Sequence, residues 1–332
     1  MVTTLAVSGA AACLATLAAR HLALRPAPTL ALGVSVLALL LGVQHSLARR
    51  AARARTGAFL RGKRVWITGA SSGLGRSLAL AASRHGAQVV LTARRETVLQ
   101  EVATLCVAAG CSGAPTVIAA DLGGDSKTLV GLVAVHGLED VDVLVNNAGV
   151  SSRSRCEDTD IAVDERLMRV NFLGQVAVTK GTLPAMLARG EGRLVFVSSV
   201  QGLLALPFRS SYSASKHALQ GYCDCLRAEV AARGVQVLVV SAGYIATSLS
   251  LNAVTGEGVK YGRTDATTAA GADPDALAED ILAGVAAGDV RMMPAPLHAR
   301  LAVVLQWLLP AAIDRIMAGR YRRQAHELKL SN

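Results

Sequence analysis

The residues best suited to chemistry are a tyrosine and a lysine that stand four positions apart. Tyr212 and Lys216 bound the stretch Tyr-Ser-Ala-Ser-Lys, and on a helix positions i and i+4 lie on one face. Because a nearby ammonium group favours phenolate, we expect Lys216 to lower the pKa of Tyr212 from its usual value of about 10. Tyr212 would then serve as an acid or base near neutral pH. This spacing alone is common on protein surfaces, so the rest of the chain must supply the context.

Short apolar runs alternate with helix-like stretches from Lys63 onward and predict the frame that positions these groups. Runs of this length, bounded by turns with Gly or Asn, are typical of buried parallel strands. Six runs have this character: Val65–Thr68, Val89–Thr92, Val117–Ala120, Val143–Val145, Leu194–Ser198 and Val235–Val240. The alternation predicts an α/β fold with a doubly wound parallel sheet. Because no linker interrupts it, we place a single catalytic domain at residues 63–293.

A glycine-rich turn follows the first predicted strand and opens the first predicted helix. Glycine lets the backbone approach a pyrophosphate closely, and the start of a helix offers free N–H groups and the positive end of its dipole. A position between strand and helix is the context that a dinucleotide site requires. We therefore predict that the turn binds the cofactor through Gly69, Ser71, Ser72, Gly73, Leu74 and Gly75.

The end of the second predicted strand indicates which dinucleotide is bound. An acidic residue at this position binds the ribose 2′-hydroxyl of NAD, whereas an arginine accommodates the 2′-phosphate of NADP. The chain has Arg94 and Arg95 here. Two guanidinium groups favour NADP(H); the alternative is that one of the arginines merely faces solvent.

Together these motifs resemble those of the short-chain dehydrogenase/reductase family. The glycine turn has the family's T-G-x-x-x-G-x-G spacing, and Tyr212 with Lys216 forms its Y-x-x-x-K pair. Ser199 precedes Tyr212 by the family's offset, at the end of the fifth predicted strand. Asn171 lies within a predicted helix, where asparagine is otherwise unfavourable, and matches the fourth member of the family's tetrad. The resemblance implies a Rossmann-type domain that binds a nicotinamide cofactor.

The resemblance also implies a role for each member of the tetrad. NADPH delivers hydride to a substrate carbonyl carbon, and Tyr212 donates a proton to the carbonyl oxygen. Ser199 hydrogen-bonds that oxygen and stabilises its developing charge. Lys216 lowers the pKa of Tyr212 and holds the nicotinamide ribose. Asn171 holds a water that passes protons to Lys216.

Further cofactor contacts follow from the same resemblance. Asp121, after the third predicted strand, matches the residue that contacts adenine, and Asn147 and Ala148 belong to the N-N-A-G turn that walls the cofactor. Ile245 and Thr247 follow the sixth predicted strand, where the family's threonine touches the nicotinamide amide.

One position departs from the family pattern. Ala242 stands where a proline is usual after the sixth strand. Because alanine lacks the fixed φ angle of proline, we expect this turn to be looser, although no catalytic group is lost.

Two apolar stretches precede the domain. Met1–Ala19 carries no charged residue, and Ala27–Leu47 is uncharged and long enough to span a bilayer. We predict that residues 1–48 anchor the chain in a membrane, as a two-helix hairpin or through the second stretch alone. A cleaved signal peptide is the third alternative, but no positive region precedes the first stretch. Residues 49–62 form a basic linker, and the positive-inside rule then places the domain in the cytosol.

The C-terminal residues 294–332 are predicted to form an amphipathic helical extension. Leu297–Ile313 is largely apolar and includes Trp307, and arginines follow from Arg315. Its uncharged part is too short to span a bilayer. It either lies in the membrane interface with Trp307 at headgroup level or packs on the domain or a partner subunit.

Charge and cysteine usage exclude two classes of partner. The net charge of +10 is an N-terminal feature, because residues 1–64 contain nine of the 34 Lys and Arg residues and no acidic residue. The remaining 25 basic residues face 24 acidic ones, so no nucleic-acid-binding surface is predicted. The cysteines form no C-x-x-C pair and stand beside no histidine cluster, so no metal site is predicted.

A closer resemblance joins the chain to one membrane-anchored subgroup of the family. It rests on stretches such as Leu206–Arg209 and Asp224–Glu229 and covers most of the domain. It implies an enzyme of the endoplasmic reticulum or peroxisome membrane that reduces acyl- or alkyl-dihydroxyacetone phosphate. It also implies a homodimer or homotetramer, and for such proteins a lumenal domain stays an open alternative.

The substrate itself stays open at this point. Residues 248–273 hold the position of the family's substrate lid, and Arg209, Lys260 and Arg263 either bind a substrate phosphate or are solvated charges. A lipid-like carbonyl substrate is the first hypothesis, and a steroid or retinoid the second. A third hypothesis, from another class, is a nucleotide-sensing regulatory protein that does no chemistry.

Overall fold

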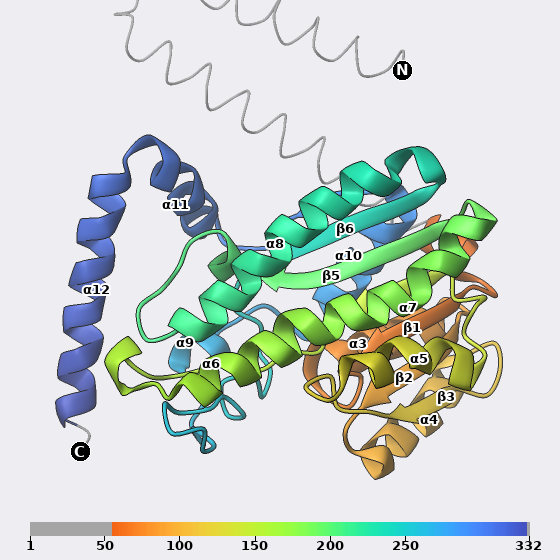
Figure 1. Cartoon of the computed structure of the whole chain (residues 1–332), viewed down its shortest axis with the longest axis horizontal. Helices are drawn as coiled ribbons and strands as arrows, with labels where there is room; N and C mark the ends of the chain where they lie inside the picture. The colour runs from red at the N-terminus through yellow and green to blue at the C-terminus, as the bar shows by residue number, and fades with distance from the viewer. Residues whose placement is uncertain (1–54, 331–332) are drawn as a thin grey trace, which may run out of the picture. The chain divides into compact units, whose positions relative to one another are not determined.

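The computed structural model of the chain describes residues 55–330, with side chains described up to His326. Seven strands form one parallel sheet in the order β3-β2-β1-β4-β5-β6-β7 (Figure 1). The strands are β1 (Arg64–Thr68), β2 (Gln88–Ala93), β3 (Thr116–Ala119), β4 (Val143–Asn146), β5 (Gly192–Ser199), β6 (Val235–Ala242) and β7 (Arg291–Met292). This architecture confirms the predicted doubly wound α/β fold. The predicted membrane segments at residues 1–48 lie outside the described residues.

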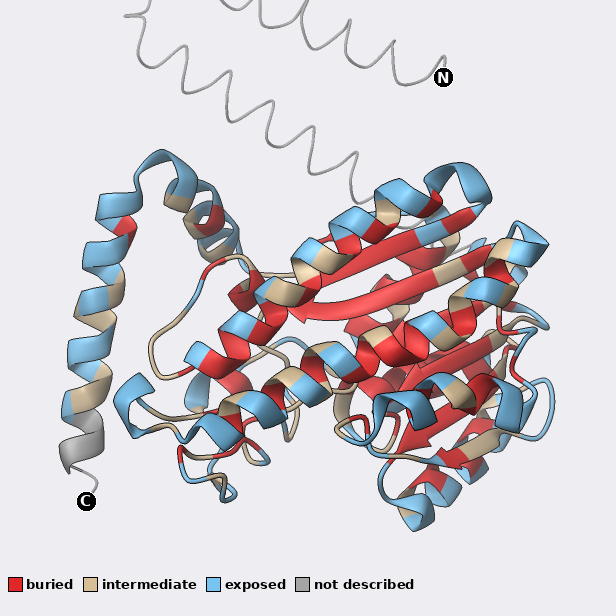
Figure 2. Cartoon of the chain, viewed as in Figure 1, coloured by how far each residue is buried: buried red, intermediate tan, exposed pale blue. Residues whose placement is uncertain are grey.

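Helices cover both faces of the sheet. Those of the first face are α3 (Gly73–Arg84), α4 (Glu96–Ala109) and α10 (Pro274–Ala287), and those of the second are α5 (Ser126–His136), α7 (Gly174–Arg189) and α8 (Ser210–Val230). The short helices α6 (Ile161–Met168) and α9 (Ala266–Ala269) lie in the connections. Because helices cover both faces of the sheet, the strands are largely buried (Figure 2). Such strands must be apolar along their whole length, so they read as continuous runs in the sequence.

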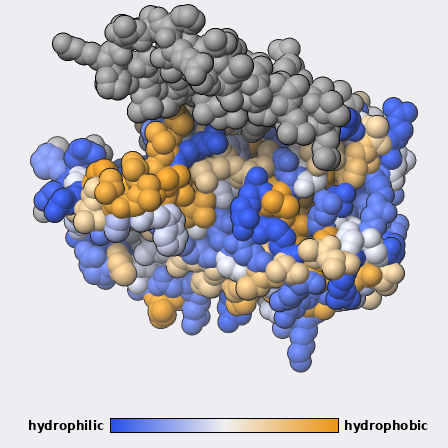
Figure 3. Space-filling model, turned by 90° about the horizontal axis from the view of Figure 1, so that it is seen from above, coloured by the Kyte–Doolittle hydropathy of each residue, from blue (hydrophilic) through white to orange (hydrophobic). Residues whose placement is uncertain are grey.

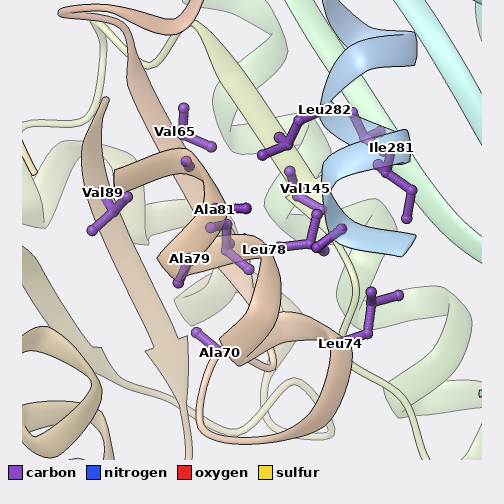
Figure 4. Close-up of a cluster of buried hydrophobic side chains, with 14 of the residues drawn as sticks. Val65, Ala70, Leu74, Leu78, Ala79, Ala81, Val89, Val145, Ile281 and Leu282 are labelled. Atoms are coloured by element: carbon purple, nitrogen blue, oxygen red, sulfur yellow. The ribbon is translucent and has the colours of Figure 1, made fainter. Parts of the chain in front are cut away.

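Alternation along β1 shows how the core is divided. Val65 and Ile67 pack toward α3 on one face, whereas Trp66 packs toward α5 and α7 on the other, because successive side chains of a strand point to opposite faces. The first cluster includes Leu78 of α3 and Ile281 of α10 around the centre of the sheet (Figure 4). This cluster fixes the start of α3, and therefore the glycine turn, against the end of β1.

The point where the strand order reverses lies between β1 and β4, which pair directly. In open parallel sheets a ligand crevice forms outside the carboxyl ends of the strands at such a point. All six predicted strands are present, each within two residues of its predicted bounds. The seventh, β7, was not predicted, because two residues give no readable apolar run.

The ends of the described chain add three helical pieces. Residues 55–60, within the predicted basic linker, are helical, and Leu60 is fully buried in the core. At the other end, α11 (Leu297–Leu308) and α12 (Pro310–Leu330) follow the domain. Pro310 begins α12, where its missing N–H costs nothing. Within residues 55–330, no helix combines the length and the apolar character that crossing a membrane demands.

Close packing of α5 against α7 predicts the effect of one methyl group. A Cβ atom at Gly181 of α7 would lie 2.5 Å from the Val130 carbonyl oxygen of α5, so Gly181→Ala must push the helices apart. We expect a loss of roughly 1–3 kcal/mol in the free energy of unfolding, measured by urea denaturation. Gly131→Ala in α5 is the matched control, because its Cβ meets nothing within 4 Å. It should stabilise the protein by up to about 1 kcal/mol, and equal effects of both changes would contradict this packing.

Candidate active site

A cavity of about 720 Å³ opens at the carboxyl ends of the strands, where the strand order reverses. It brings together every residue predicted to bind the cofactor: Gly69, Ser71, Ser72, Gly73, Leu74, Gly75, Arg94, Arg95, Asp121, Asn147, Ala148, Tyr212, Lys216, Ile245 and Thr247. Ser199 lines the same cavity, and Asn171 is the one member of the predicted tetrad that does not. Among residues 55–330, no group of three or more His, Cys, Asp or Glu side chains is placed to hold a metal.

The glycine turn needs its glycines for steric reasons. Gly69 has a φ angle of +70°, and a Cβ there would lie 2.8 Å from the Ala148 Cα. A Cβ at Gly75 would lie 2.2 Å from the Gly69 carbonyl oxygen. The following helix α3 has no side-chain cap at Ser72 and no acidic residue in its first turn. Its first N–H groups and its positive dipole end therefore suit a pyrophosphate.

Hydrogen bonds fix this turn to the neighbouring strand end. Thr68 Oγ1 accepts from the backbone N–H of Asn147 at 3.0 Å and of Ala148 at 3.2 Å. In return, the Asn147 amide donates to the Thr68 carbonyl oxygen at 3.0 Å. Gln175 of α7 donates to the Ala148 carbonyl oxygen at 2.8 Å. The ends of β1 and β4 thus form one rigid wall of the cavity.

The adenosine end of the cavity is positively charged. Arg94 and Arg95 follow directly after β2 and are exposed at the cavity wall. Asp121 follows β3, and its Oδ1 accepts from the Gly123 N–H at 2.9 Å. Arg94 and Arg95 thus line the cavity at the end of β2, the position at which an acidic residue would bind the ribose hydroxyl of NAD.

The predicted catalytic side chains converge on the opposite part of the cavity. Tyr212 and Lys216 lie one turn apart on α8, and Ser199 ends β5. All three are buried, with exposed fractions of 6%, 3% and 8%. The Lys216 Nζ donates to the Val197 carbonyl oxygen at 2.9 Å and lies 5.9 Å from the centre of the Tyr212 ring. Helix periodicity and strand ends together place these groups as the sequence predicts.

The predicted effect of Lys216 on the pKa of Tyr212 needs correction. Burial raises the pKa of Tyr212, and the groups that oppose it are a hydrogen bond from Ser199 and the charges of Arg153 and Arg209. Burial also lowers the pKa of Lys216 to about 8, and its ammonium is directed to a backbone carbonyl on β5. The sequence pattern placed the two residues on one face but did not show how deeply both are buried.

Asn171 lies in a π-helical turn, η2 (Arg169–Leu173), between α6 and α7. Its side chain accepts from the Val150 N–H at 2.8 Å and donates to the Val150 carbonyl and to Ser215 Oγ, both at 2.9 Å. A Cβ at Gly149 would lie 3.2 Å from Asn171 Oδ1 and 3.7 Å from Lys216 Nζ. The Asn171 and Lys216 side chains therefore both lie beside Gly149, which lines the cavity. Single-turn π segments often occur at functional sites.

Sequence reasoning missed a buried charge cluster beside Tyr212. Asp265 of the lid accepts from Arg153 at 2.6 Å and from Arg209 at 2.9 Å. The Arg209 side chain is only 5% exposed, and it also donates to the Tyr244 hydroxyl at 3.2 Å. Arg209 is thus held within the protein, whereas Lys260 and Arg263 of the lid are exposed. Arg153 and Asp265 are 112 positions apart, and no motif marks either of them.

Helix α12 also reaches this region. The Tyr321 ring stacks on Phe208 with ring centroids 5.3 Å apart, and Arg320 donates to the Tyr244 hydroxyl at 3.4 Å. Phe208 has a φ angle of +63°, which is unusual for a bulky residue. The stacking on Tyr321 helps to hold the segment that leads into α8.

Ala242, which replaces the usual proline, completes β6 opposite Ser199. The chain then turns, and the Gly243 N–H donates to the Pro294 carbonyl at 3.0 Å. Beyond the turn, Thr247 faces the glycine turn, because a Cβ at Gly73 would lie 3.1 Å from its side chain. The position of Thr247 beside the start of α3 is therefore kept without proline.

The charge cluster predicts that loss of the buried Asp265 carboxylate destabilises the protein more than loss of an exposed carboxylate. Asp265→Asn leaves two buried guanidinium groups without a counter-charge, so we expect a loss of roughly 3 kcal/mol in the free energy of unfolding. Asp224→Asn is the matched control, because Asp224 also accepts from two arginines, at 2.6 and 2.8 Å, but is 48% exposed. Its loss should stay below about 1 kcal/mol. Urea denaturation at neutral pH distinguishes the two, and similar losses would refute the special role of Asp265.

The buried lysine predicts a pH-dependent gain in stability. The pKa of Lys216 falls from 10.5 to about 8 on folding, so the unfolded chain binds more protons between these values and the stability of the protein rises with pH there. Lys216→Met removes this charge. Its stability relative to the wild type should therefore be higher at neutral pH than at about pH 10, by up to ~3 kcal/mol. The exposed Lys180→Met is the control, and a flat difference for Lys216→Met would contradict the buried charge.

Comparison with known proteins identifies the family. The model described as short chain dehydrogenase matches residues 63–258. The chain is 46% identical over 272 residues to a Dehydrogenase/reductase SDR family protein 7-like of Anopheles gambiae, covering 80% of this chain and 85% of that protein. It is 43% identical over 298 residues to Dehydrogenase/reductase SDR family member 7B of Bos taurus, covering 87% and 91%.

Solved structures show the same fold. A short-chain dehydrogenase from Streptomyces avermitilis is 28% identical with a TM-score of 0.62, covering 80% of this chain and 99% of that one. A metagenomic short-chain oxidoreductase in complex with NADP is also 28% identical, with a TM-score of 0.58, covering 71% and 98%. With its fold, its glycine turn and its match over most of the catalytic domain, the chain belongs to the short-chain dehydrogenase/reductase family.

Proposed function

We propose that the protein is a membrane-anchored, NADPH-dependent carbonyl reductase that acts on a lipid-like substrate. The observation that carries this proposal is the single cavity in which Tyr212, Ser199 and Lys216 meet the glycine turn and the two arginines after β2. One end suits a phosphorylated dinucleotide, and the other end holds an acid beside a hydrogen-bond donor. The solved metagenomic relative with NADP supports NADP(H) as the cofactor.

The chemistry follows from the positions of these side chains. The cofactor, when bound, supplies the hydride for the substrate carbonyl carbon. Ser199 Oγ holds the carbonyl oxygen and stabilises the negative charge that develops on it. The Tyr212 hydroxyl donates its proton to the same oxygen. Lys216 holds the cofactor ribose, and Asn171 keeps the turn at Val150 and the adjoining helix in place.

Burial of Tyr212 supports its proposed role as the acid in carbonyl reduction. Its pKa is raised by burial, so the phenol keeps its proton at neutral pH. A protonated hydroxyl is the acid that carbonyl reduction needs, whereas alcohol oxidation needs the phenolate. The charges of Arg153 and Arg209 lower the pKa of Tyr212 and so oppose the effect of burial, which makes it easier for Tyr212 to give up its proton.

The lining of the cavity supports a substrate with an apolar part and an anionic part. Leu249 and Val254 of the lid line it, and so do Arg153, Arg166 and Lys260. Acyl- or alkyl-dihydroxyacetone phosphate has both parts and is the first candidate. A steroid or retinoid would use the apolar lining alone and is the alternative.

Membrane anchoring is the part of the proposal that rests on sequence. The uncharged Ala27–Leu47 stretch and the arginines that follow it support an anchor with a cytosolic domain. The relatives named member 7B support a common role, which we place at the endoplasmic reticulum or peroxisome membrane. A homodimer or homotetramer remains an expectation from the family.

The direct test is NADPH oxidation by the full chain in detergent, with palmitoyl-dihydroxyacetone phosphate, a 3-ketosteroid and retinal as parallel substrates. We expect turnover with the phosphorylated lipid and a preference for NADPH over NADH. Tyr212→Phe removes the proton donor while keeping the ring, so its rate should fall by about 10²-fold or more.

Cofactor binding is the control for this test. Tyr212→Phe should still bind NADPH, as measured by quenching of protein fluorescence, because the glycine turn is intact. Turnover of only the steroid or retinal would replace the lipid substrate with the alternative. Tight NADPH binding without turnover of any substrate would refute the reductase and favour a regulatory, nucleotide-sensing protein.

A further inference from the structure

Helix α11 has apolar side chains on two opposite faces. Its inner face packs on the domain through Val303, which is 9% exposed and belongs to a cluster with Leu204 and Ile313. Gln306 on the same side donates to the Leu203 carbonyl at 3.1 Å. This face alone fixes the helix to the domain, so the outer face is not needed for the fold.

The outer face is a continuous apolar stripe in contact with solvent. Its residues recur at helical spacing and have exposed fractions of 39–69%: Leu297, Leu301, Val304, Leu305 and Leu308. Figure 3 shows apolar side chains gathered on this side of the molecule, at the left, where Figure 1 places α11. A surface helix normally presents polar residues outward, and an exposed patch of this kind marks an interaction site. We call it the α11 stripe.

The surroundings of the α11 stripe indicate what it meets. Trp307, beside the stripe, is 81% exposed. Tryptophan is enriched at membrane–water interfaces, because its ring is largely apolar and its N–H group is polar. Residues 297–326 contain five arginines and one acidic residue, and Arg300, Arg315 and Arg322 are exposed. An apolar stripe with an exposed tryptophan and a positive rim fits the interface of an anionic bilayer.

We infer that α11 is a lipid-docking helix that lies in the membrane interface, with the α11 stripe in the acyl region and Arg300 and the exposed arginines of α12 at phosphate headgroups. This adds a second membrane contact to the proposed N-terminal anchor, and it lies on the catalytic unit itself. The inner face of α11 packs against Val200 and Leu203. Gln201, one of the two residues between them, lines the same cavity as Ser199. Docking therefore brings the catalytic end of the cavity close to the bilayer, where a lipid substrate resides.

The two tryptophans of the chain allow a direct test. Trp307 is exposed, whereas Trp66 is fully buried and donates to Thr92 Oγ1 at 2.8 Å, so it serves as an internal reference. The full chain is reconstituted in vesicles of phosphatidylcholine and phosphatidylserine, with or without bromine atoms on the phosphatidylcholine acyl chains. We expect brominated lipid to quench Trp307 emission, and we expect Trp307→Phe to abolish the quenching.

Variants then assign the contact to the α11 stripe. Leu301→Glu with Leu305→Glu should lose most of the quenching, because charged side chains oppose burial in lipid. Val135→Glu is the matched control, because Val135 is an apolar residue of α5 that is 76% exposed. It makes the same type of change away from α11, and it should leave the quenching unchanged.

The other occupants of the stripe give different results. A second copy of the chain, or its own apolar segment at residues 1–48, would shield Trp307 from aqueous iodide without quenching by brominated lipid, and this result would overturn the inference. Quenching by iodide alone would overturn it as well.

A separate assay distinguishes a failure of this inference from a failure of the proposed function. The inference rests on the proposed function only for the nature of the substrate. NADPH oxidation in detergent should be the same for the double glutamate variant and the wild type. Loss of this activity would show that the stripe shapes the enzyme rather than docking it to lipid, and would also overturn the inference.

Discussion

The hydrogen bonds between the ends of β1 and β4 are the constraint on which the rest of the site depends. At the reversal of strand order two parallel strands end side by side, and their connections depart to opposite faces of the sheet. The Thr68 hydroxyl accepts from Asn147 and Ala148, and the Asn147 amide returns a bond to the Thr68 carbonyl. This reciprocal clamp holds the glycine turn and the Asn147 turn at a fixed separation. Without it, the cavity would have no rigid wall for a cofactor.

The second wall depends on buried polar contacts between helices. Asn171 joins the turn at Val150 to Ser215 of α8, and Lys216 joins α8 to the Val197 carbonyl of β5. Such bonds are strong in a dry interior, and the groups are costly to leave without partners. They position Tyr212 beside Ser199, but burial of the charge on Lys216 costs stability. The site thus keeps functional groups where a purely structural core would place apolar ones.

The lid and the C-terminal helices extend the site beyond the sheet. Asp265 holds the lid to Arg153 and Arg209, while Arg320 of α12 reaches Tyr244 near the same cluster. These contacts connect the electrostatic environment of Tyr212 to segments that carry no recognisable motif. The inner face of α11 continues this arrangement, so the surface proposed to meet lipid packs on residues that adjoin Ser199.

The sequence alone determined the parts of the protein that depend on local patterns. Buried parallel strands need unbroken apolar runs, so all six longer strands were predictable, and the glycine turn and the pair Tyr212 and Lys216 are local spacings. Only the tertiary structure decided the pKa of Tyr212, because its burial and the charge of Arg153 come from segments far away in the sequence. It also decided the pairing of Asp265 with Arg153, which lie 112 positions apart. Contacts at such separation depend on how loops close over the sheet, and no period or spacing in the chain encodes them.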